Sequence, residues 1–196
     1  PAKACAGIPA IKLAFSLDTD SKAFLVTTAF YMAYFFLALP SSWILEKTGM
    51  KKGMALGLLV MAIGTFLFGH FATDRNYTLS LFGLFVIGSG LSILQTASNP
   101  YISIIGPIES AAQRISIMGI CNKGAGILAP LVFAAVILKA TDSDLFKQLE
   151  HMTGPARAIA LDEFISRVKL PYFCVGILLF LLGLGVRFSP LPEIDT

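Results

Sequence analysis

Residues 76–108, NYTLSLFGLFVIGSGLSILQTASNPYISIIGPI, contain no Asp, Glu, Lys or Arg. A helix crosses the hydrocarbon core of a bilayer with about 20 predominantly apolar residues. The segment is long enough for one crossing followed by an exit segment. We therefore predict a membrane-spanning helix at about residues 79–105.

Four further segments contain no charged residue apart from Lys123, and the other charged residues of the chain lie at or between these segments. The whole chain is 14% charged and has a mean hydropathy of +0.77, whereas a soluble domain is about 25% charged. This composition excludes most soluble folds and predicts an all-α integral membrane protein. Besides 79–105, the predicted spans are 23–45, 53–71, 115–138 and 170–186.

The connections between these spans differ in length. Residues 4–16 are too short for a complete crossing, so we interpret them as the end of an earlier span. The link at 46–52 is tight, which predicts that the spans on either side of it are antiparallel neighbours. The loop at 139–169 holds charges of both signs, and we expect two surface helices in it, at about 144–152 and 155–168.

The glycines of the span at 53–71 predict close helix packing. They include Gly53, Gly57 and Gly64. In lipid, no hydrophobic effect drives helices together, and small residues let their backbones approach closely. We therefore expect another helix against this face.

The span at 79–105 carries a polar stripe. Gly88, Ser92, Gln95 and Asn99 recur at helical spacing and so share one face. In a bilayer such a face is expected to meet protein or water. Pro100 lacks a backbone donor, and we expect an interruption of the helix there, a feature that often marks a binding site.

The span at 115–138 has a second polar stripe, which includes an ionisable residue. An ionisable side chain within a span indicates a functional site by default, which favours a role for Lys123. The alternative is that its stem extends toward the interface near Arg114. Asn122 lies about 100° around the helix from Lys123. The stripe consists of Ser116, Gly119, Lys123, Gly126 and Pro130.

Patterns typical of catalysis and of nucleic-acid binding are absent from the sequence. It has no HExxH or CxxC motif and no pair of acidic residues within a predicted span. An enzyme, a metal site and a cofactor are therefore not expected. The net charge is +3, without a basic run that alternates with aromatic residues, so nucleic acid is not an expected partner.

The carboxamides of Gln95, Asn99 and Asn122 are the candidates for a binding site. Each one both donates and accepts hydrogen bonds, which suits a neutral polyhydroxyl solute. Tyr31 and Tyr34 would add an apolar ring face and a hydroxyl. The alternative is that the amides only join helices in a membrane protein with a structural or sensory role. These residues alone leave both interpretations open.

Four short blocks of sequence carry a resemblance to a known family. They are Leu94–Tyr101 (LQTASNPY), Gly106–Glu109 (GPIE), Arg114–Ser116 (RIS) and Cys121–Gly124 (CNKG). Together they resemble the fucose/glucose/galactose (sugar:cation symporter) branch of the major facilitator superfamily. Within that branch they look most like bacterial glucose/galactose transporters.

The link after the span at 23–45 resembles the loop motif of the same superfamily, G-x-x-x-D-R-x-G-x-K-K. The resemblance implies that this loop is cytoplasmic and latches the inward side, although counting Lys and Arg would place it outside. Here a serine stands for the first glycine, a glutamate for the aspartate and a lysine for the arginine. The matching residues are Ser42, Glu46, Lys47, Gly49, Lys51 and Lys52.

The resemblance implies a secondary transporter of a hexose, of the glucose/galactose or fucose type, that works by alternating access. The chain would be most of the N-terminal six-helix half of a twelve-span protein, with five complete spans and a stub of span one. Its expected location is the bacterial cytoplasmic membrane. Its expected partners are a monosaccharide, a co-transported proton or sodium ion, the lipid bilayer and the C-terminal half.

The resemblance also implies roles for single residues. Gln95 stands where proton-coupled fucose carriers have a glutamate, and Asn122 matches an asparagine that lines the central cavity. Because a glutamine does not titrate, the coupling ion is open between proton, sodium and none. Lys123 would hold a charge network in the cavity or take part in coupling.

Overall fold

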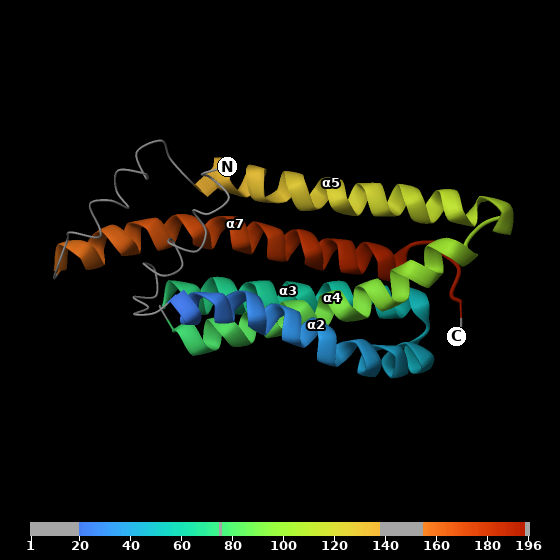
Figure 1. Cartoon of the computed structure of the whole chain (residues 1–196), viewed down its shortest axis with the longest axis horizontal. Helices are drawn as coiled ribbons and strands as arrows, with labels where there is room; N and C mark the ends of the chain where they lie inside the picture. The colour runs from blue at the N-terminus through green and yellow to red at the C-terminus, as the bar shows by residue number, and fades with distance from the viewer. Residues whose placement is uncertain (1–19, 75, 138–154, 195–196) are drawn as a thin grey trace.

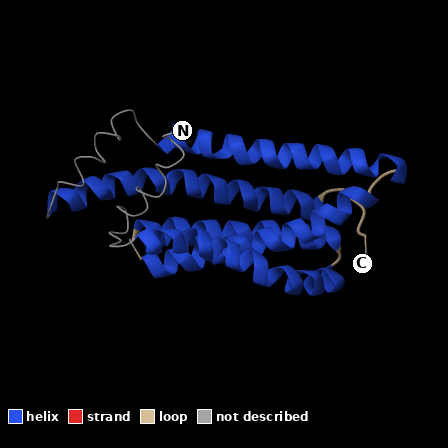
Figure 2. Cartoon of the chain, viewed as in Figure 1, coloured by secondary structure: helices blue, strands red, loops and turns tan. Residues whose placement is uncertain are grey.

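The computed structural model describes residues 20–74, 76–137 and 155–194. These residues are helical apart from short connections (Figures 1 and 2). The segments at 4–16 and 144–152, for which the sequence predicts the end of a span and a surface helix, lie outside the described residues. The helices are α2 (Asp20–Thr48), α3 (Met50–Thr73), α4 (Tyr77–Ile104), α5 (Ala111–Ile137) and α7 (Pro155–Phe188), with a 3-10 turn, η2 (Ile108–Ser110).

Each of the five long helices contains a segment long and apolar enough to cross a membrane. An α-helix satisfies its backbone polar groups internally, which is why it is stable in lipid. The predicted all-α membrane fold with five spanning helices is therefore confirmed. The membrane-capable segments are Thr28–Thr48, Met50–Ala72, Tyr77–Ile104, Ile108–Val132 and Lys169–Phe188.

The turn between α2 and α3 is a single residue, Gly49, with a φ of 78°. That backbone region is costly for residues with a Cβ, so glycine allows the chain to reverse here. Leu45 occupies the space that a side chain at Gly53 would need. At the other end of α3, the Asn76 side chain accepts a hydrogen bond of 3.2 Å from the backbone N–H of Leu79 and caps α4.

The contacts between the helices place them in the order α2, α4, α3, α7. Helices α2 and α3 have few contacts with each other, because α4 packs extensively against both. The short link thus makes α2 and α3 adjoin at the turn, but it does not make them neighbours along their lengths. A tight turn fixes only the adjoining ends of two helices, and the fit of their faces decides which helix lies alongside.

Glycines bring α3 and α4 into backbone contact. A Cβ at Gly57 would lie 2.8 Å from the carbonyl oxygen of Gly90, and one at Gly64 would lie 2.7 Å from the backbone nitrogen of Ile87. From the opposite side, a Cβ at Gly83 would lie 2.8 Å from the backbone nitrogen of Phe68. The predicted close packing is thus confirmed for Gly57 and Gly64, and the partner is α4.

Helices α7 and α4 continue through prolines, and at one of them, Pro100, the sequence predicts an interruption. Helix α7 runs from Pro155 through Pro171 to Phe188, so the surface helix expected at about 155–168 and the span expected at 170–186 form one continuous helix. Helix α4 passes through Pro100 and ends at Ile104, so the expected interruption is not observed. A proline removes one hydrogen bond of a helix, and neighbouring groups or water can satisfy the freed carbonyl.

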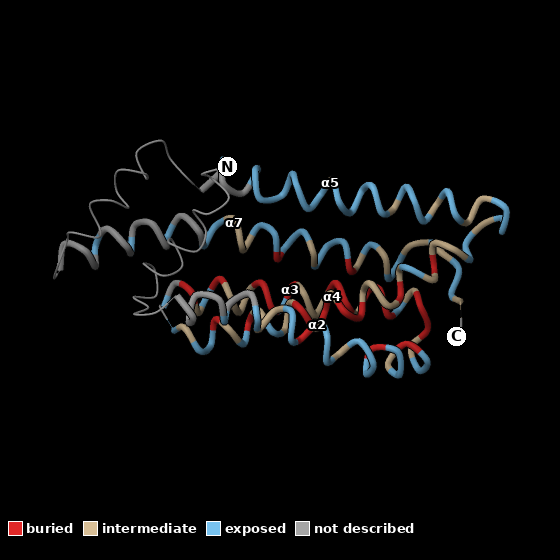
Figure 3. The backbone as a smooth tube through the Cα atoms, viewed as in Figure 1, coloured by how far each residue is buried: buried red, intermediate tan, exposed pale blue. Residues whose placement is uncertain are grey.

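Helix α5 differs from the other helices in its surroundings. Figure 3 shows it exposed along most of its described length, whereas α3 and α4 have many buried positions. Its contacts with α4 and with α7 are few. The described part of the bundle therefore consists of a packed set, α2, α3, α4 and α7, and a peripheral α5.

Candidate functional site

Gln95 on α4 and Tyr34 on α2 form a polar pair between two helices. The Tyr34 hydroxyl donates a hydrogen bond of 2.8 Å to Oε1 of Gln95. Both side chains are half-buried. The structure therefore brings together two of the residues that the sequence selects as candidates for a binding site.

The polar stripe of α4 faces α2 along most of its length. A Cβ at Gly88 would lie 2.6 Å from the carbonyl oxygen of Phe30. One turn further, the hydroxyl oxygens of Ser92 and Ser41 are 3.1 Å apart and buried. Ser41 has no special spacing in the sequence that would have identified it. The stripe is thus a close helix contact at Gly88 and Ser92, and it becomes accessible at Gln95.

The hydrogen bond between Tyr34 and Gln95 leaves binding capacity on both partners. A carboxamide has two N–H donors besides its oxygen, and a phenol oxygen accepts as well as donates. In the described structure the amide nitrogen of Gln95 has no hydrogen-bond partner. The pair can therefore both donate to and accept from the hydroxyls of a bound solute.

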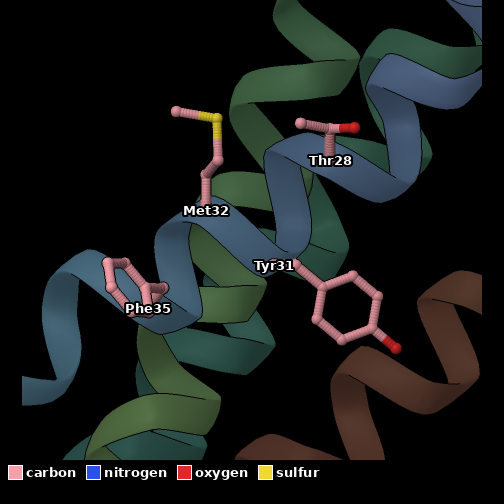
Figure 4. Close-up of a pocket in the computed structure, with 4 residues that line it drawn as sticks. All are labelled: Thr28, Tyr31, Met32 and Phe35. Atoms are coloured by element: carbon pink, nitrogen blue, oxygen red, sulfur yellow. The ribbon is translucent and has the colours of Figure 1, made fainter.

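The remaining aromatic candidate lies elsewhere on α2. Tyr31 is 62% exposed and lines a shallow, open and mainly apolar hollow together with Thr28, Met32 and Phe35. Figure 4 shows its ring extending from the opposite side of the helix to Met32. The structure shows no hydrogen bond from Tyr31 to Gln95 within the described residues.

Three further candidates are exposed. Asn99 lies one turn beyond Gln95 on α4, and Asn122 and Lys123 lie on α5. In the described part of the chain, none of the three makes a hydrogen bond or an ion pair. A Cβ at Gly119 or at Gly126 would have no atom within 4 Å. The α5 stripe therefore has open space around it and is not joined to the amides of α4.

Arg114, at the start of α5, is a residue whose role the sequence did not suggest. Its Nε donates to the carbonyl oxygen of Ile102 at 2.9 Å, and its Nη2 donates to that of Ser103 at 2.9 Å. Its Nη1 donates to the carbonyl oxygen of Pro107 at 2.9 Å and to the hydroxyl of Ser110 at 2.6 Å. One guanidinium thus joins α5 to the end of α4.

The loop motif divides into two parts with different surroundings. The Lys51 ammonium donates a hydrogen bond of 2.7 Å to the carbonyl oxygen of Ser189, and the Lys52 ammonium lies 3.9 Å from the Glu193 carboxylate. The segment at 189–194 is also held by the Tyr101 hydroxyl, which donates to the carbonyl oxygen of Pro192 at 3.0 Å. The two lysines therefore bind the segment after α7.

The first part of the motif remains on the surface. Ser42, Glu46 and Lys47 are exposed at the end of α2. The Lys47 ammonium lies 3.7 Å from the centroid of the Trp43 ring, within the range of a cation–π contact. Glu46 and Lys47 are thus accessible to another part of the protein, whereas Lys51 and Lys52 contact the segment at 189–194.

Proteins with similar sequences are bacterial carriers. The chain is 30% identical over 189 residues to the L-fucose-proton symporter of Escherichia coli (strain K12), a match that covers 96% of this chain and 43% of that protein. It is 37% identical over 155 residues to the glucose/galactose transporter of Brucella abortus biovar 1 (strain 9-941), covering 79% of this chain and 37% of the relative. The chain thus spans less than half the length of these relatives.

Solved structures and a family profile agree with these similarities. The crystal structure of the transporter FucP in the outward conformation matches with a TM-score of 0.75 and 27% identity, over 99% of this chain and 47% of FucP. The profile of the Major Facilitator Superfamily matches residues 5–193. With its five membrane-capable helices, the chain is a multi-pass protein of the bacterial inner membrane and belongs to the Major Facilitator Superfamily.

Proposed function

We propose that the full-length protein is a secondary transporter that carries a hexose across the cytoplasmic membrane by alternating access. In this mechanism a central site opens to one face at a time as two helical bundles move against each other. The names of the similar proteins, an L-fucose-proton symporter and glucose/galactose transporters, support a sugar as the substrate. Residues 1–196 would supply most of the N-terminal bundle.

The hydrogen bond between Tyr34 and Gln95 is the observation that carries this proposal. It holds a carboxamide in one orientation at a half-buried position of a membrane-capable helix. A sugar hydroxyl needs both a donor and an acceptor, and the pair offers both. An amide fixed before binding loses less conformational freedom when the sugar binds.

The other candidates complete the proposed site. Asn99 would extend the hydrogen-bonding surface by one helical turn from Gln95, and Asn122 would contact the sugar from α5. Tyr31 would offer its exposed ring to the apolar face of a sugar. Lys123 would take part in a charge network within the cavity. Each of these side chains is exposed in the described structure and free to bind a solute or the C-terminal bundle.

The loop motif would control the inward side of the transporter. We infer that Glu46 and Lys47 contact the C-terminal bundle, because they are exposed. Lys51 and Lys52 would instead hold the segment at 189–194 within the N-terminal bundle. The exposed apolar side chains of the membrane-capable segments would face lipid or the other bundle.

We infer that transport is coupled to a cation but that position 95 does not carry the proton. A carboxamide does not titrate, so Gln95 binds only through hydrogen bonds. The ion is distinguished by measuring uptake under an imposed proton gradient and under an imposed sodium gradient. Uptake that responds to neither gradient would leave facilitated diffusion as the mechanism.

The proposal is tested by uptake of radiolabelled glucose, galactose and fucose into proteoliposomes that contain the full-length protein. Gln95→Ala and Asn122→Ala are each expected to raise the KM roughly tenfold, because a polar group of the sugar loses its partner. Gln113→Ala, an exposed amide at the start of α5, is the matched control and should transport as the wild type does. Unchanged transport in both test variants would overturn the site assignment. If the wild-type protein transports no hexose, the proposed transport function fails and the alternative, a structural or sensory role, remains.

A further inference from the structure

The junction between α4 and α5 is built around one side chain. Arg114 makes four hydrogen bonds of 2.6–2.9 Å, to three carbonyl oxygens and one hydroxyl. Two of the carbonyls, those of Ile102 and Ser103, belong to the last turn of α4. The others belong to Pro107 and Ser110, which lie between the two helices.

The electrostatics of a helix end favour this contact. The last carbonyls of an α-helix have no partner within the helix, and they carry the negative end of the helix dipole. A guanidinium is planar, permanently charged and bears several N–H donors in a fixed arrangement. Arg114 therefore satisfies carbonyls that α4 alone cannot, and it does so from the first turn of the next helix.

The residues around the Arg114 guanidinium leave room for it and accept its hydrogen bonds. A Cβ at Gly106 would lie 2.9 Å from Nη1 of Arg114, so a side chain there would displace the guanidinium. The Ser110 hydroxyl accepts from Nη1 and itself donates to the carbonyl oxygen of Pro107 at 3.1 Å. The same carbonyl oxygen thus receives hydrogen bonds from both side chains.

Beyond this junction little holds α5 in place. From Ile115 to Val132 its residues are exposed, apart from Met118 and Gly124, which are half-buried. Asn122 lies eight residues after Arg114, or about 12 Å along the helix axis. A change in the direction of α5 at the junction would therefore move Asn122 and Lys123 relative to Gln95.

We propose that Arg114 is a positioning residue that sets α5, with Asn122 and Lys123, relative to Gln95 on α4. Its effect on sugar binding rests on the function proposed above, whereas its effect on the placement of α5 does not. Lysine at this position keeps the charge but loses the planar fork, so it can satisfy fewer of the four acceptors. The positions of the α5 side chains should then become less well defined.

Two measurements on the full-length protein test the proposal with Arg114→Lys. In uptake, the KM for the transported hexose is expected to rise about fivefold, the effect of one misaligned hydrogen bond. In a cysteine-free background, spin labels at Thr78 and Leu131 should give a broader distribution of distances between α4 and α5. Arg187→Lys is the matched control, since Arg187 is exposed at the end of α7 and makes no hydrogen bond within the described residues.

A double variant separates positioning from general stability. If Arg114 acts through Asn122, then adding Arg114→Lys to Asn122→Ala should raise the KM less than it does in the wild-type background. Should Arg114→Lys fail to fold, Ser110→Ala removes one of the four acceptors, and a smaller change in the same direction is expected. A distance distribution and a KM equal to those of the wild type would overturn the proposal, as would a broadened distribution with an unchanged KM.

If the wild type transports no hexose, the proposed function fails, and the distance distribution alone then supports or overturns the placement of α5.

Discussion

Helices α4 and α5 each carry a polar stripe that includes glycine and serine, but the surroundings of the glycines on the two helices differ. On α4, Cβ atoms at Gly88 and Gly90 would lie 2.6 Å from atoms of neighbouring helices. On α5, Cβ atoms at Gly119 and Gly126 would meet nothing within 4 Å. Glycines thus form a close contact on one helix and an open face on the other.

The difference indicates a division of roles between the two helices. Because α4 lies between α2 and α3, its small residues are used for packing, and its amide at Gln95 is held by Tyr34. Helix α5 does not lie between two helices in the described structure, so there is open space beside its small residues. Enlarging the small residues of α4 should therefore destabilise the bundle, whereas enlarging those of α5 should not.

The largest expected effect is that of Gly90→Ala on α4. A Cβ there would lie 2.6 Å from Cγ of Met61 and 2.7 Å from both the Gly57 carbonyl oxygen and the Met61 backbone nitrogen. Two of these three atoms are backbone, so α3 and α4 must move apart, at a cost of about 1–3 kcal/mol. We expect less monodisperse full-length protein after detergent extraction and a lower temperature of thermal denaturation.

Gly185→Ala on α7 is the control for this variant, because a Cβ there would have no atom within 4 Å. It should extract and denature as the wild type does. If Gly90→Ala were as stable as Gly185→Ala, the close contact between α3 and α4 would not exist in the protein in its membrane.

A smaller effect, on transport and not on stability, is expected from Tyr34→Phe. The change removes the hydroxyl that holds Gln95 and leaves the ring in place. The loss of one hydrogen bond, about 1 kcal/mol, should raise the KM of sugar uptake about fivefold with little change in the denaturation temperature.

Tyr172→Phe is the control for Tyr34→Phe. Tyr172 lies on α7, and its ring packs against that of Phe68 on α3. The control should leave the KM unchanged. A wild-type KM in Tyr34→Phe as well would exclude the pair of Tyr34 and Gln95 from the sugar site.

The positions of the helices could be predicted from the sequence because a charged side chain is costly in hydrocarbon. The long uncharged segment at 76–108 contains the whole of α4, and the glycines at 57 and 64 indicated a close helix contact. The resemblance carried by the block at 94–101 led to the family, which the profile match confirms. These features are local, and each can be recognised within about one helix length.

The partners of each face could not be predicted in the same way. Periodicity shows that Gly88, Ser92 and Gln95 share a face, but it does not identify α2 as the helix opposite. The role of Arg114 depends on where the end of α4 lies in space, which no spacing in the sequence encodes. The resemblance of the loop motif implied a latch on the inward side, whereas the binding of Lys51 and Lys52 to residues 189–194 became evident only from the fold.

The smallest effect is expected from Gly119→Ala on α5, and it tests the open side of the comparison directly. Alanine is about 1 kcal/mol more favourable than glycine inside a helix, and the new methyl group would meet no atom of the described structure. The full-length variant should therefore denature at the wild-type temperature or slightly above it. A clear loss of stability, comparable with that of Gly90→Ala, would mean that another part of the protein packs closely against this face. In that case Asn122 and Lys123 would lie in a helix contact and not beside a water-filled site, and their proposed roles in sugar binding and coupling would fail.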